Sequence, residues 1–538
     1  MIPSLLLLLG LVIGCLLAGK TLIHYFQLES YQFPGYFRTL KRNWLKALLP
    51  GCCMTVFLIL SLLGIGALIS SRWLSCLTES LLLVLFGYAL SRLLSEKKPK
   101  KPFALTARVK RLYAVSVLVM MLILCLIAMP LFQAVTPDDG RIHARITLIL
   151  LFPLFLPLWI ALCGLLAWPI EKGISELYFR DAQKILRSRP DLIRIGITGS
   201  WGKTSVKFIL GTLLEEKYHT LVTPASYNTP MGVTKVIRTM LEPGHRVFVS
   251  EMGARHVGDI REMCRLVHPQ LGVLTSVGPQ HLDTFKTVER VASTKYELIE
   301  ALPKDGTAFF ADDGGLCRGL YEKTAMTKFI SGLDAGKDDL WAENLRYSPE
   351  GTRFDLCREG QRWECRTELL GELNVRNILL AASVAFHLEL SPEQVIRGIG
   401  KIKPVEHRLQ LIHYPGGIHV VDDAFNSNIR GARQAFEILK AFPGKRVIIT
   451  PGMVELGERE EELNREFGCA MDGCCDEAVL VGERRSRAIR EGLASAGFPQ
   501  NHIHVVSSLE EAVRWMKENV SPGDTVLFEN DLPDNYTE

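Results

Sequence analysis

The sequence carries little net charge of either sign. Its 62 lysines and arginines nearly balance its 58 aspartates and glutamates, which leaves a formal net charge of +4 at pH 7. Because nucleic-acid binding depends on a concentrated positive field, this balance argues against nucleic acid as a partner. Charged residues make up only 22% of the 538-residue chain and hydrophobic residues 48%, which excludes a disordered chain of polar composition.

The 13 cysteines lack the spacing of a metal site or of a disulfide framework. Six of them lie inside apolar runs, at Cys15, Cys52, Cys53, Cys76, Cys125 and Cys163. Free thiols of this kind are typical of a reducing compartment, so we expect the polar part of the chain to lie in the cytoplasm.

Long apolar runs are concentrated in the first third of the chain. A helix needs about 20 apolar residues to cross a bilayer. The candidate runs are Pro3–Gly19, Ala47–Ser70, Trp73–Leu94, Tyr113–Ala134 and Ile146–Trp168. Apart from Glu79 they hold no central ionisable residue, and a transport path usually needs such residues. Residues 1–170 are therefore expected to form a membrane region of about five helices that serves as an anchor or lipid-binding platform. A cleaved signal peptide is the alternative for the first run, which lacks the basic residues that begin such peptides.

Basic residues in the connections between these runs predict their orientation. They cluster between Lys20 and Lys46 and again between Lys97 and Arg111, whereas the alternate connections hold few. The positive-inside rule then places the N-terminus outside the cell membrane and everything after Trp168 in the cytoplasm. The basic connection Glu96–Arg111 is interpreted as a topology signal on anionic lipid or, alternatively, as a site for a pyrophosphate-bearing lipid head group.

A glycine-rich segment after the membrane region has the pattern of a phosphate-binding loop. A short apolar strand pattern from Leu192 leads into Thr-Gly-Ser-Trp-Gly-Lys-Thr-Ser at residues 198–205, and a helical pattern follows. Glycines let backbone N–H groups surround phosphate oxygens, while Lys203 would reach the terminal phosphates of ATP and the Thr204 hydroxyl would bind Mg²⁺. The predicted ATP-binding residues of the loop are Gly199, Ser200, Gly202, Lys203, Thr204 and Ser205. Ile197 occupies the position of the first glycine of the common loop, so a chance match is the alternative.

Short apolar strands alternate with helical patterns from here to the C-terminus, which is typical of an α/β protein. We expect an ATP-binding central domain at residues 171–405, a hinge near Pro404–His407 and a smaller Rossmann-like domain at residues 406–538. The strands expected in the last domain are His419–Val421, Arg446–Thr450, Ala478–Val481, His504–Val506 and Thr525–Phe528.

The phosphate-binding loop resembles that of the Mur ligase family, which carries Thr-Gly-x-x-Gly-Lys-Thr/Ser at this place. Across about Leu186–Glu538, further segments resemble the motifs of the family in the same order. These segments are Tyr227–Val233, Val247–Ala254, Gly278–Phe285, Ser293–Ile299, Gly371–Asn377, Glu406–Leu409 and Val421–Asn428.

The resemblance implies a site for two Mg²⁺ ions. Glu251 would ligate one ion together with Thr204, and His281 would bind the second. Lys295 stands at the place of the lysine that reacts with CO₂ in this family, and the resulting carbamate bridges the two metal ions.

The resemblance also implies which side chains bind the nucleotide and the substrate. Arg408 would reach the phosphates and Asp423 the ribose. The ATP-binding residues of this part are Asn374, Asn377, Arg408, Asp423 and Asn426, and the substrate residues are Asn228 and Thr229. Leu373 and Phe425 depart from the family pattern, because a histidine and a tyrosine are usual at these two places.

The reaction that the resemblance implies is ATP-dependent amide ligation, in which a carboxylate takes the γ-phosphate of ATP and an amine displaces phosphate. Lys203, Arg408 and two Mg²⁺ ions would offset the repulsion between the anionic reactants, and Lys203, Lys295, His281 and Arg408 are the predicted catalytic residues. The C-terminal segments most resemble the branch that adds D-alanyl-D-alanine to UDP-N-acetylmuramoyl-tripeptide in peptidoglycan biosynthesis.

The identity of the substrate is the open question, because membrane runs replace the domain that binds the UDP end in that branch. The chain would join an amino acid or dipeptide to a soluble muramoyl-peptide, to a lipid-linked precursor, or to a poly-γ-glutamate-type acceptor. An ATP-driven membrane transporter is the hypothesis from a different class, and the scarcity of charges inside the apolar runs disfavours it.

Overall fold

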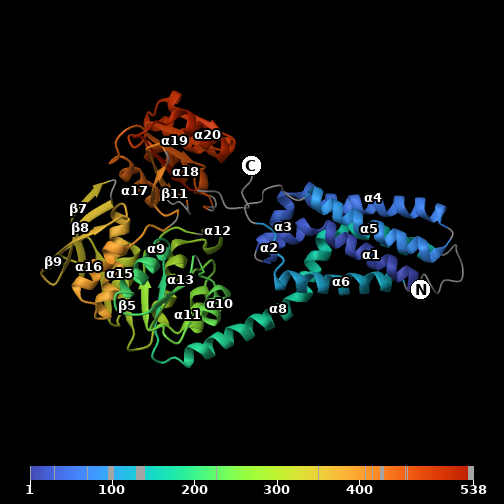
Figure 1. The fold of residues 1–538 in the computed structure, drawn as a ribbon, viewed down its shortest axis with the longest axis horizontal. Coiled ribbons are helices and arrows are strands. Elements are labelled where there is room, and N and C mark those ends of the chain that lie inside the picture. The colour runs from blue at the N-terminus through green and yellow to red at the C-terminus, as the bar shows by residue number, and fades with distance from the viewer. Residues whose placement is uncertain are drawn as a thin grey trace. The chain divides into compact units, whose positions relative to one another are not determined.

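The structure is a computed structural model of the whole chain (Figure 1). It describes all residues except 1, 30, 70, 95–101, 129–139, 226, 281, 349–350, 406, 415, 425–428, 455, 457–458 and 531–538. The chain divides into two compact units, the first from Met1 to Glu176 and the second from Leu177 to Leu532.

The first unit is a bundle of helices. Its elements are α1 (Ile2–Ala18), α2 (Lys20–Leu28), α3 (Phe33–Arg42), α4 (Trp44–Leu68), α5 (Arg72–Leu94), α6 (Ala107–Ala128), α7 (Gly140–Leu151), the 3₁₀ turn η2 (Phe152–Phe155) and α8 (Leu156–Arg187). Among the described residues, four helical stretches are long and apolar enough to cross a membrane, or five if α1 and α2, bent by 49°, count as one span. The predicted N-terminal region of apolar helices is therefore confirmed.

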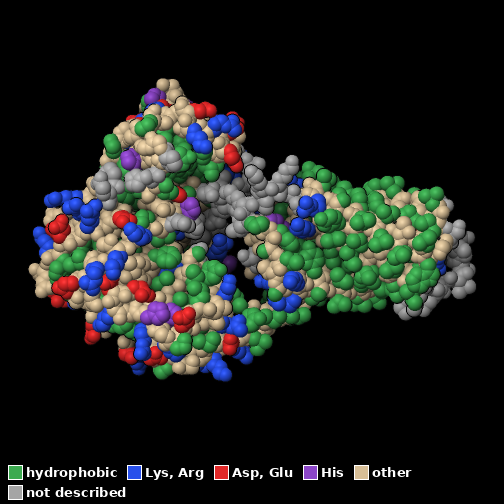
Figure 2. Space-filling model, viewed as in Figure 1, with side chains coloured by type: hydrophobic (Ala, Val, Ile, Leu, Met, Phe, Trp, Pro, Cys, Tyr) green, Lys and Arg blue, Asp and Glu red, His purple; other side chains and the backbone are tan. Residues whose placement is uncertain are grey.

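The outer surface of this bundle is apolar. Leucines such as Leu63, Leu118 and Leu126 have more than half of their surface exposed, and Figure 2 shows a nearly continuous hydrophobic face over the bundle. Soluble proteins rarely expose so large an apolar area, because its contact with water is unfavourable, whereas lipid tails accept it.

Glycines allow the helices inside the bundle to approach closely. A Cβ atom on Gly14 of α1 would lie 2.5 Å from the carbonyl oxygen of Leu83 in α5, and one on Gly87 would lie 2.2 Å from the carbonyl oxygen of Gly14. Small residues at such a crossing let two backbones come into contact, which is how helices associate in lipid.

The last apolar run, Ile146–Trp168, covers the end of α7, the turn η2 and the start of α8, and α8 continues beyond it. α8 passes Pro169 without a break and ends at Arg187, in the second unit. A proline inside a helix removes one backbone hydrogen bond but does not require the helix to end.

The second unit contains a large sheet with a mainly parallel arrangement. The strand order is β2-β3-β1-β4-β5-β6-β7-β8-β9, in which β8 and β9 are antiparallel to their neighbours. The strands are β1 (Ile193–Thr198), β2 (Thr220–Val222), β3 (Val247–Glu251), β4 (Leu271–Leu274), β5 (Thr307–Ala311), β6 (Lys328–Gly332), β7 (Leu340–Ser348), β8 (Gly351–Arg358) and β9 (Gln361–Thr367). The central strands are buried along most of their length, as expected for strands covered by helices on both faces.

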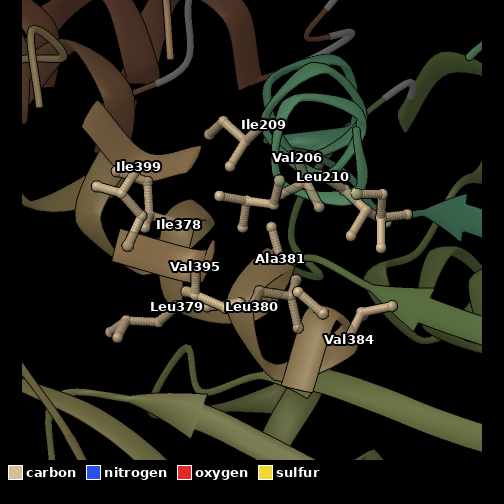
Figure 3. Close-up of a cluster of buried hydrophobic side chains, with 14 of the residues drawn as sticks. Val206, Ile209, Leu210, Ile378, Leu379, Leu380, Ala381, Val384, Val395 and Ile399 are labelled. Carbon is tan, nitrogen blue, oxygen red and sulfur yellow. The ribbon is translucent and has the colours of Figure 1, made fainter. Parts of the chain in front are cut away.

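Helices cover this sheet. They are α9 (Lys203–Leu214), α10 (Pro230–Met240), α11 (Asp259–Val267), α12 (Leu282–Phe285), α13 (Val288–Glu300), α14 (Leu316–Lys323), α15 (Glu372–His387) and α16 (Pro392–Lys401). Figure 3 shows how α9, α15 and α16 meet: Leu210 and Ile209 of α9 face Ile378 and Ala381 of α15, and Ile399 of α16 packs nearby. This cluster fixes α9, the helix that begins at the phosphate-binding loop.

The C-terminal part of the second unit has a second sheet of order β10-β11-β15-β12-β13-β14. Its strands are β10 (Gln410–Tyr414), β11 (Ile418–Asp423), β12 (Arg446–Thr450), β13 (Glu477–Val481), β14 (Ile503–Val506) and β15 (Thr525–Glu529), and its helices are α17 (Ile429–Leu439), α18 (Glu460–Met471), α19 (Glu483–Ala496) and α20 (Leu509–Asn519). Five of these strands agree with the predicted ones within one or two residues. The sixth, β10, is an antiparallel edge strand that the sequence pattern did not predict. The predicted α/β class is confirmed for both sheets.

We expect the Leu210→Ala substitution to lower the free energy of unfolding of the second unit by about 2–5 kcal/mol, because it opens a cavity between α9 and α15. Chemical denaturation of the full chain in detergent measures the effect. Met240→Ala, at a side chain that is 43% exposed on α10, is the control and is expected to change the value by less than about 0.5 kcal/mol. Equal losses in the two variants would contradict the packing described here.

Candidate functional site

The phosphate-binding loop and Glu251 lie at the same edge of the large sheet. β1 is the neighbour of β3 on one side and of β4 on the other, and all three strands run parallel. Ile197 is in register with Glu251, so the loop that follows β1 begins beside the glutamate that ends β3. The carboxyl edge of a parallel sheet is where ligands bind in open α/β folds.

Two glycines shape the loop. Gly202 has φ +78° and precedes the first residue of α9, and a Cβ atom there would lie 2.7 Å from Oδ1 of Asn377. A Cβ atom on Gly199 would lie 2.0 Å from Oγ1 of Thr275. Any larger residue would therefore collide with a neighbour, and at Gly202 it would also be strained in its backbone.

The side chain of Lys203 remains within the loop. Its Nζ atom donates to the carbonyl oxygens of Gly199 at 2.8 Å and Ser200 at 3.0 Å. Burial lowers the pKa of Lys203 to about 8; Glu251 raises this pKa, and Arg408 lowers it further. A cation held in so little water gains strongly from an anionic ligand such as a phosphate.

Glu251 is the centre of a buried polar cluster. Its Oε2 atom accepts hydrogen bonds from the Thr204 hydroxyl and from Nζ of Lys207, both at 3.0 Å, and its Oε1 atom accepts one from Nδ2 of Asn228, also at 3.0 Å. Burial alone would raise the pKa of Glu251, but Lys207 and Lys203, with these hydrogen bonds, hold it below its usual value. The carboxylate is therefore ionised and oriented towards Thr204.

Lys207 is a member of this cluster that the sequence analysis missed. Its side chain is fully buried, and Nζ also donates to the carbonyl oxygen of Ala225, a residue at φ +43°. Lys207 follows Lys203 by four residues on α9, and residues at this spacing lie on the same face of a helix. That spacing was the available signal, but the partner Glu251 is distant in sequence.

Lys295 lies almost completely buried on α13. Burial lowers the pKa of its amine well below the ordinary value and the positive charge of Lys203 lowers it further, whereas Asp259, Glu251 and Glu297 act in the opposite direction. A buried lysine of this kind has a neutral amine in a larger share of molecules than an exposed one. The burial of Lys295 has no local signal in the sequence, and only the family resemblance selected this residue.

A cavity adjoins the loop on the side of the C-terminal sheet. Several predicted ATP-binding residues line it, namely Gly202, Ser205, Asn374, Asn377, Arg408 and Asp423. Residues that the sequence analysis did not select also line it, namely Trp201, Asp312, Asp313, Arg376, Gln434 and Glu529. Asp312 and Asp313 directly follow β5, so their position at the end of a buried strand was a signal that could have found them.

Arg408 and Asp423 approach the cavity as a pair of opposite charges. Burial lowers the pKa of the Arg408 guanidinium, against the influence of Asp423 and Glu251. Burial likewise raises the pKa of Asp423, while Arg408 and the backbone N–H of Leu409 oppose that rise; this N–H donates to Oδ1 of Asp423 at 3.0 Å. The partly buried guanidinium of Arg408 suits an anionic ligand, because its planar donors match phosphate oxygens.

Three predicted site residues are not placed at the cavity or at the polar cluster around Glu251. His281 and Asn426 lie outside the described residues. Thr229 caps α10 through its hydroxyl, which accepts from the backbone N–H of Gly232 at 3.3 Å. In the described part of the chain, no group of three or more histidine, cysteine, aspartate or glutamate side chains is arranged to hold a metal ion.

Two known protein domains match this chain, one over the large sheet and the other over the C-terminal sheet. The Mur ligase middle domain matches residues 197–385, and the Mur ligase glutamate ligase domain matches residues 407–529. Neither match includes the N-terminal helices.

Relatives with these domains are ligases. The chain is 27% identical to the UDP-N-acetylmuramoyl-tripeptide–D-alanyl-D-alanine ligase of Bacillus subtilis over 336 residues, which cover 62% of this chain and 72% of that protein. It is 30% identical to the ligase of the same name from Mycobacterium tuberculosis over 357 residues, which cover 62% of this chain and 69% of that protein. The crystal structure of the MurF ligase of Thermotoga maritima in complex with ADP is 26% identical and superimposes with a TM-score of 0.60, covering 66% of this chain and 80% of that one.

We expect Lys207→Met to lower the free energy of unfolding by about 3–5 kcal/mol, because it leaves the Glu251 carboxylate buried without its cation. Chemical denaturation measures the loss. Combining Lys207→Met with Glu251→Gln should recover part of the stability, because the uncompensated charge is removed. Lys304→Met, at an exposed lysine, is the control with little expected effect. A double variant no more stable than Lys207→Met would contradict the charge pairing.

Proposed function

We propose that the chain adds D-alanyl-D-alanine or a similar amine to a muramoyl-peptide precursor of peptidoglycan. The chain belongs to the Mur ligase family of ATP-dependent acid–amino-acid ligases. The names of its relatives support this choice, since ligases for this dipeptide match both domains. We further propose that the N-terminal helices hold the enzyme in the cell membrane with both catalytic domains, residues 171–405 and 406–538, in the cytoplasm.

The observation that carries the proposal is the arrangement of Lys203, Thr204 and Glu251 around one glycine loop, beside a cavity lined by Arg408. Lys203 and Arg408 supply two partly buried positive charges for the phosphates of ATP. Asn374 and Asn377 line the same cavity and are proposed to contact the nucleotide base.

Ligation would proceed in two steps that these residues favour by position and charge. An oxygen of the acceptor carboxylate bonds to the γ-phosphorus of ATP while the bond from that phosphorus to ADP breaks. The amine nitrogen then bonds to the acyl carbon, phosphate leaves with the electron pair of the carbon–oxygen bond, and the surplus proton of the amine passes to solvent. Lys203 and Arg408 offset the repulsion between the acceptor carboxylate and the phosphates.

The donor set around Thr204 fits Mg²⁺. A hydroxyl and a carboxylate oxygen 3.0 Å apart are hard ligands, and Mg²⁺ in phosphoryl-transfer sites is commonly held by few protein oxygens together with phosphates and water. The bound ion would neutralise charge on the transferring phosphoryl group. Asn228 fixes the second oxygen of Glu251 and thereby orients the ligand. His281 is proposed for a second ion on the family resemblance alone.

The lowered pKa of Lys295 supports its proposed reaction with CO₂, because only a neutral amine can attack the carbon atom. The amine loses a proton as the nitrogen–carbon bond forms, and the product is a carbamate that carries a negative charge. This modification would give the site a second acidic group beside Glu251.

A lipid-linked acceptor is the second candidate, and one observation favours it. Apolar helices occupy the place of the N-terminal domain, so the unit that precedes the catalytic domains is suited to lipid. A poly-γ-glutamate-type acceptor has no comparable support. The family assignment argues against the ATP-driven transporter.

We expect the full-length chain, purified in detergent, to release phosphate from ATP and Mg²⁺ when D-alanyl-D-alanine and an acceptor are both present. One arm contains UDP-N-acetylmuramoyl-tripeptide and another its lipid-linked counterpart. Release with the soluble acceptor supports the first candidate, and release with the lipid-linked form alone supports the second. Silence in both arms would contradict the proposed substrates.

The Lys295→Ala substitution is expected to lower phosphate release by about a hundredfold, because the site loses the carbamate carboxylate. Added short carboxylates such as acetate should restore part of the activity. Arg290→Ala, at an exposed residue of the same helix, is the matched control and should retain full turnover. Full turnover in Lys295→Ala would contradict the role of this lysine.

A further inference from the structure

A group of cations lies at one end of the helical bundle, and Figure 2 shows basic side chains gathered at the end of the bundle near α2 and α3. The segment that leads into α6 runs along α2 in a fixed register. Phe103 lies under Nζ of Lys20, which is 5.3 Å from the ring centroid. Ala104 and Gln27 exchange two hydrogen bonds, at 2.9 Å and 3.3 Å. Arg108 then lies against Tyr31.

The guanidinium of Arg108 stacks on the Tyr31 ring, and this contact does not use its N–H donors. Its guanidinium carbon is 3.9 Å from the centroid of the Tyr31 ring, a distance typical of stacking. Its nearest anionic atom is Oε2 of Glu171, at 3.8 Å from Nε, which is beyond hydrogen-bond distance. Among the described residues, no acceptor takes a hydrogen bond from this guanidinium, and 40% of the side chain is exposed. Stacking therefore orients the N–H groups and leaves them available.

Glu171 is already occupied by a second arginine. Nε and Nη2 of Arg111 donate to its two oxygens at 2.5 Å and 2.8 Å, in the bidentate geometry that satisfies a carboxylate. Two guanidinium groups therefore lie beside one carboxylate, and both oxygens of that carboxylate accept from Arg111 and not from Arg108. Lys20, at the first residue of α2, lies over the Phe103 ring and begins the register that brings Arg108 to Tyr31.

Tyr31 shows that the stack is imposed by the fold. Its backbone has φ +63°, a conformation that bulky residues rarely adopt. The ring is fixed by Phe26, whose centroid is 5.5 Å away. A signal that only orients a membrane protein requires positive charge, and any exposed lysine supplies it. Such a signal requires neither a strained aromatic residue nor a planar cation stacked on it.

We propose that Arg108, stacked on Tyr31, forms a binding site for the phosphate group of a membrane lipid. Phosphate is the ligand because its oxygens accept the paired N–H groups of a guanidinium and its negative charge is attracted to that of Arg108. The proposal rests on the membrane location proposed for the first unit and is independent of the substrates proposed for the ligase. Its lipid has two sources, an anionic phospholipid of the bilayer or a lipid that carries a pyrophosphate.

Native mass spectrometry of the full-length chain in a neutral detergent tests the site. Dioleoylphosphatidylglycerol, a polyprenyl pyrophosphate and dioleoylphosphatidylcholine are titrated separately, with excess ADP present so that the phosphate-binding loop is filled. We expect Arg108→Lys and Tyr31→Leu to weaken the binding of a phosphate-bearing lipid about tenfold. Arg108→Lys keeps the charge that determines topology, and both variants leave the Arg111–Glu171 pair intact. Lys110→Gln removes an exposed charge from the same turn and should weaken binding less than about twofold.

The outcomes separate the sources and test the site. Preferential binding of the polyprenyl pyrophosphate supports a site for a lipid-linked molecule, and equal binding of phosphatidylglycerol supports a site for bilayer lipid. Arg108→Lys binding like the unsubstituted chain would overturn the proposal, as would an equal loss in Lys110→Gln, because diffuse charge would then explain the binding. Thermal unfolding of each variant shows whether the bundle is intact. Phosphate release is measured separately, so failure of the proposed ligase substrates leaves this result unaffected.

Discussion

The buried carboxylate of Glu251 is the constraint on which the site depends. It ends a central strand, and its two oxygens are held from three directions by Thr204, Lys207 and Asn228. These residues belong to the first turns of α9 and to the segment before α10, so one side chain connects β3, the phosphate-binding loop and the proposed substrate segment. A buried carboxylate without these partners would be strongly destabilising. The hydrophobic cluster between α9, α15 and α16 holds α9, which carries Thr204 and Lys207, in place.

The C-terminal part of the second unit brings a second set of charges, Arg408 and Asp423, to the cavity beside the same loop. Arg408 lies in the segment between α16 and β10, and the residues on each side of it, His407 and Leu409, both have positive φ. Such backbone conformations are costly for residues other than glycine and persist only where the surroundings impose them. The position of Arg408 beside the cavity is thus determined by its local backbone as well as by its electrostatic attraction to Asp423.

Much of this arrangement could be predicted from the sequence, because its signals are local. The glycines and Lys203 between a strand and a helix identify the loop, and alternating apolar runs identify five of the six C-terminal strands. Pairings between distant segments left no such signal: the contact of Lys207 with Glu251 and the burial of Lys295 depend on how the strands are ordered in the sheet. The antiparallel strands β8 and β9 and the edge strand β10 were missed for the same reason. The last apolar run ends at Trp168, whereas α8 continues to Arg187, because the end of an apolar run predicts the end of a membrane span and not the end of its helix.

Trp201 lies between the two glycines of the loop and places a fluorescent side chain at the site. Its ring packs so closely on Gly278 that a Cβ atom there would lie 2.1 Å from Cη2 of the indole, and the residue also lines the cavity. The emission of an indole depends on the polarity around it. The protein therefore carries an intrinsic fluorophore at the phosphate-binding loop, in contact with the segment that leads to His281, and occupancy of this loop can be followed without attaching a dye.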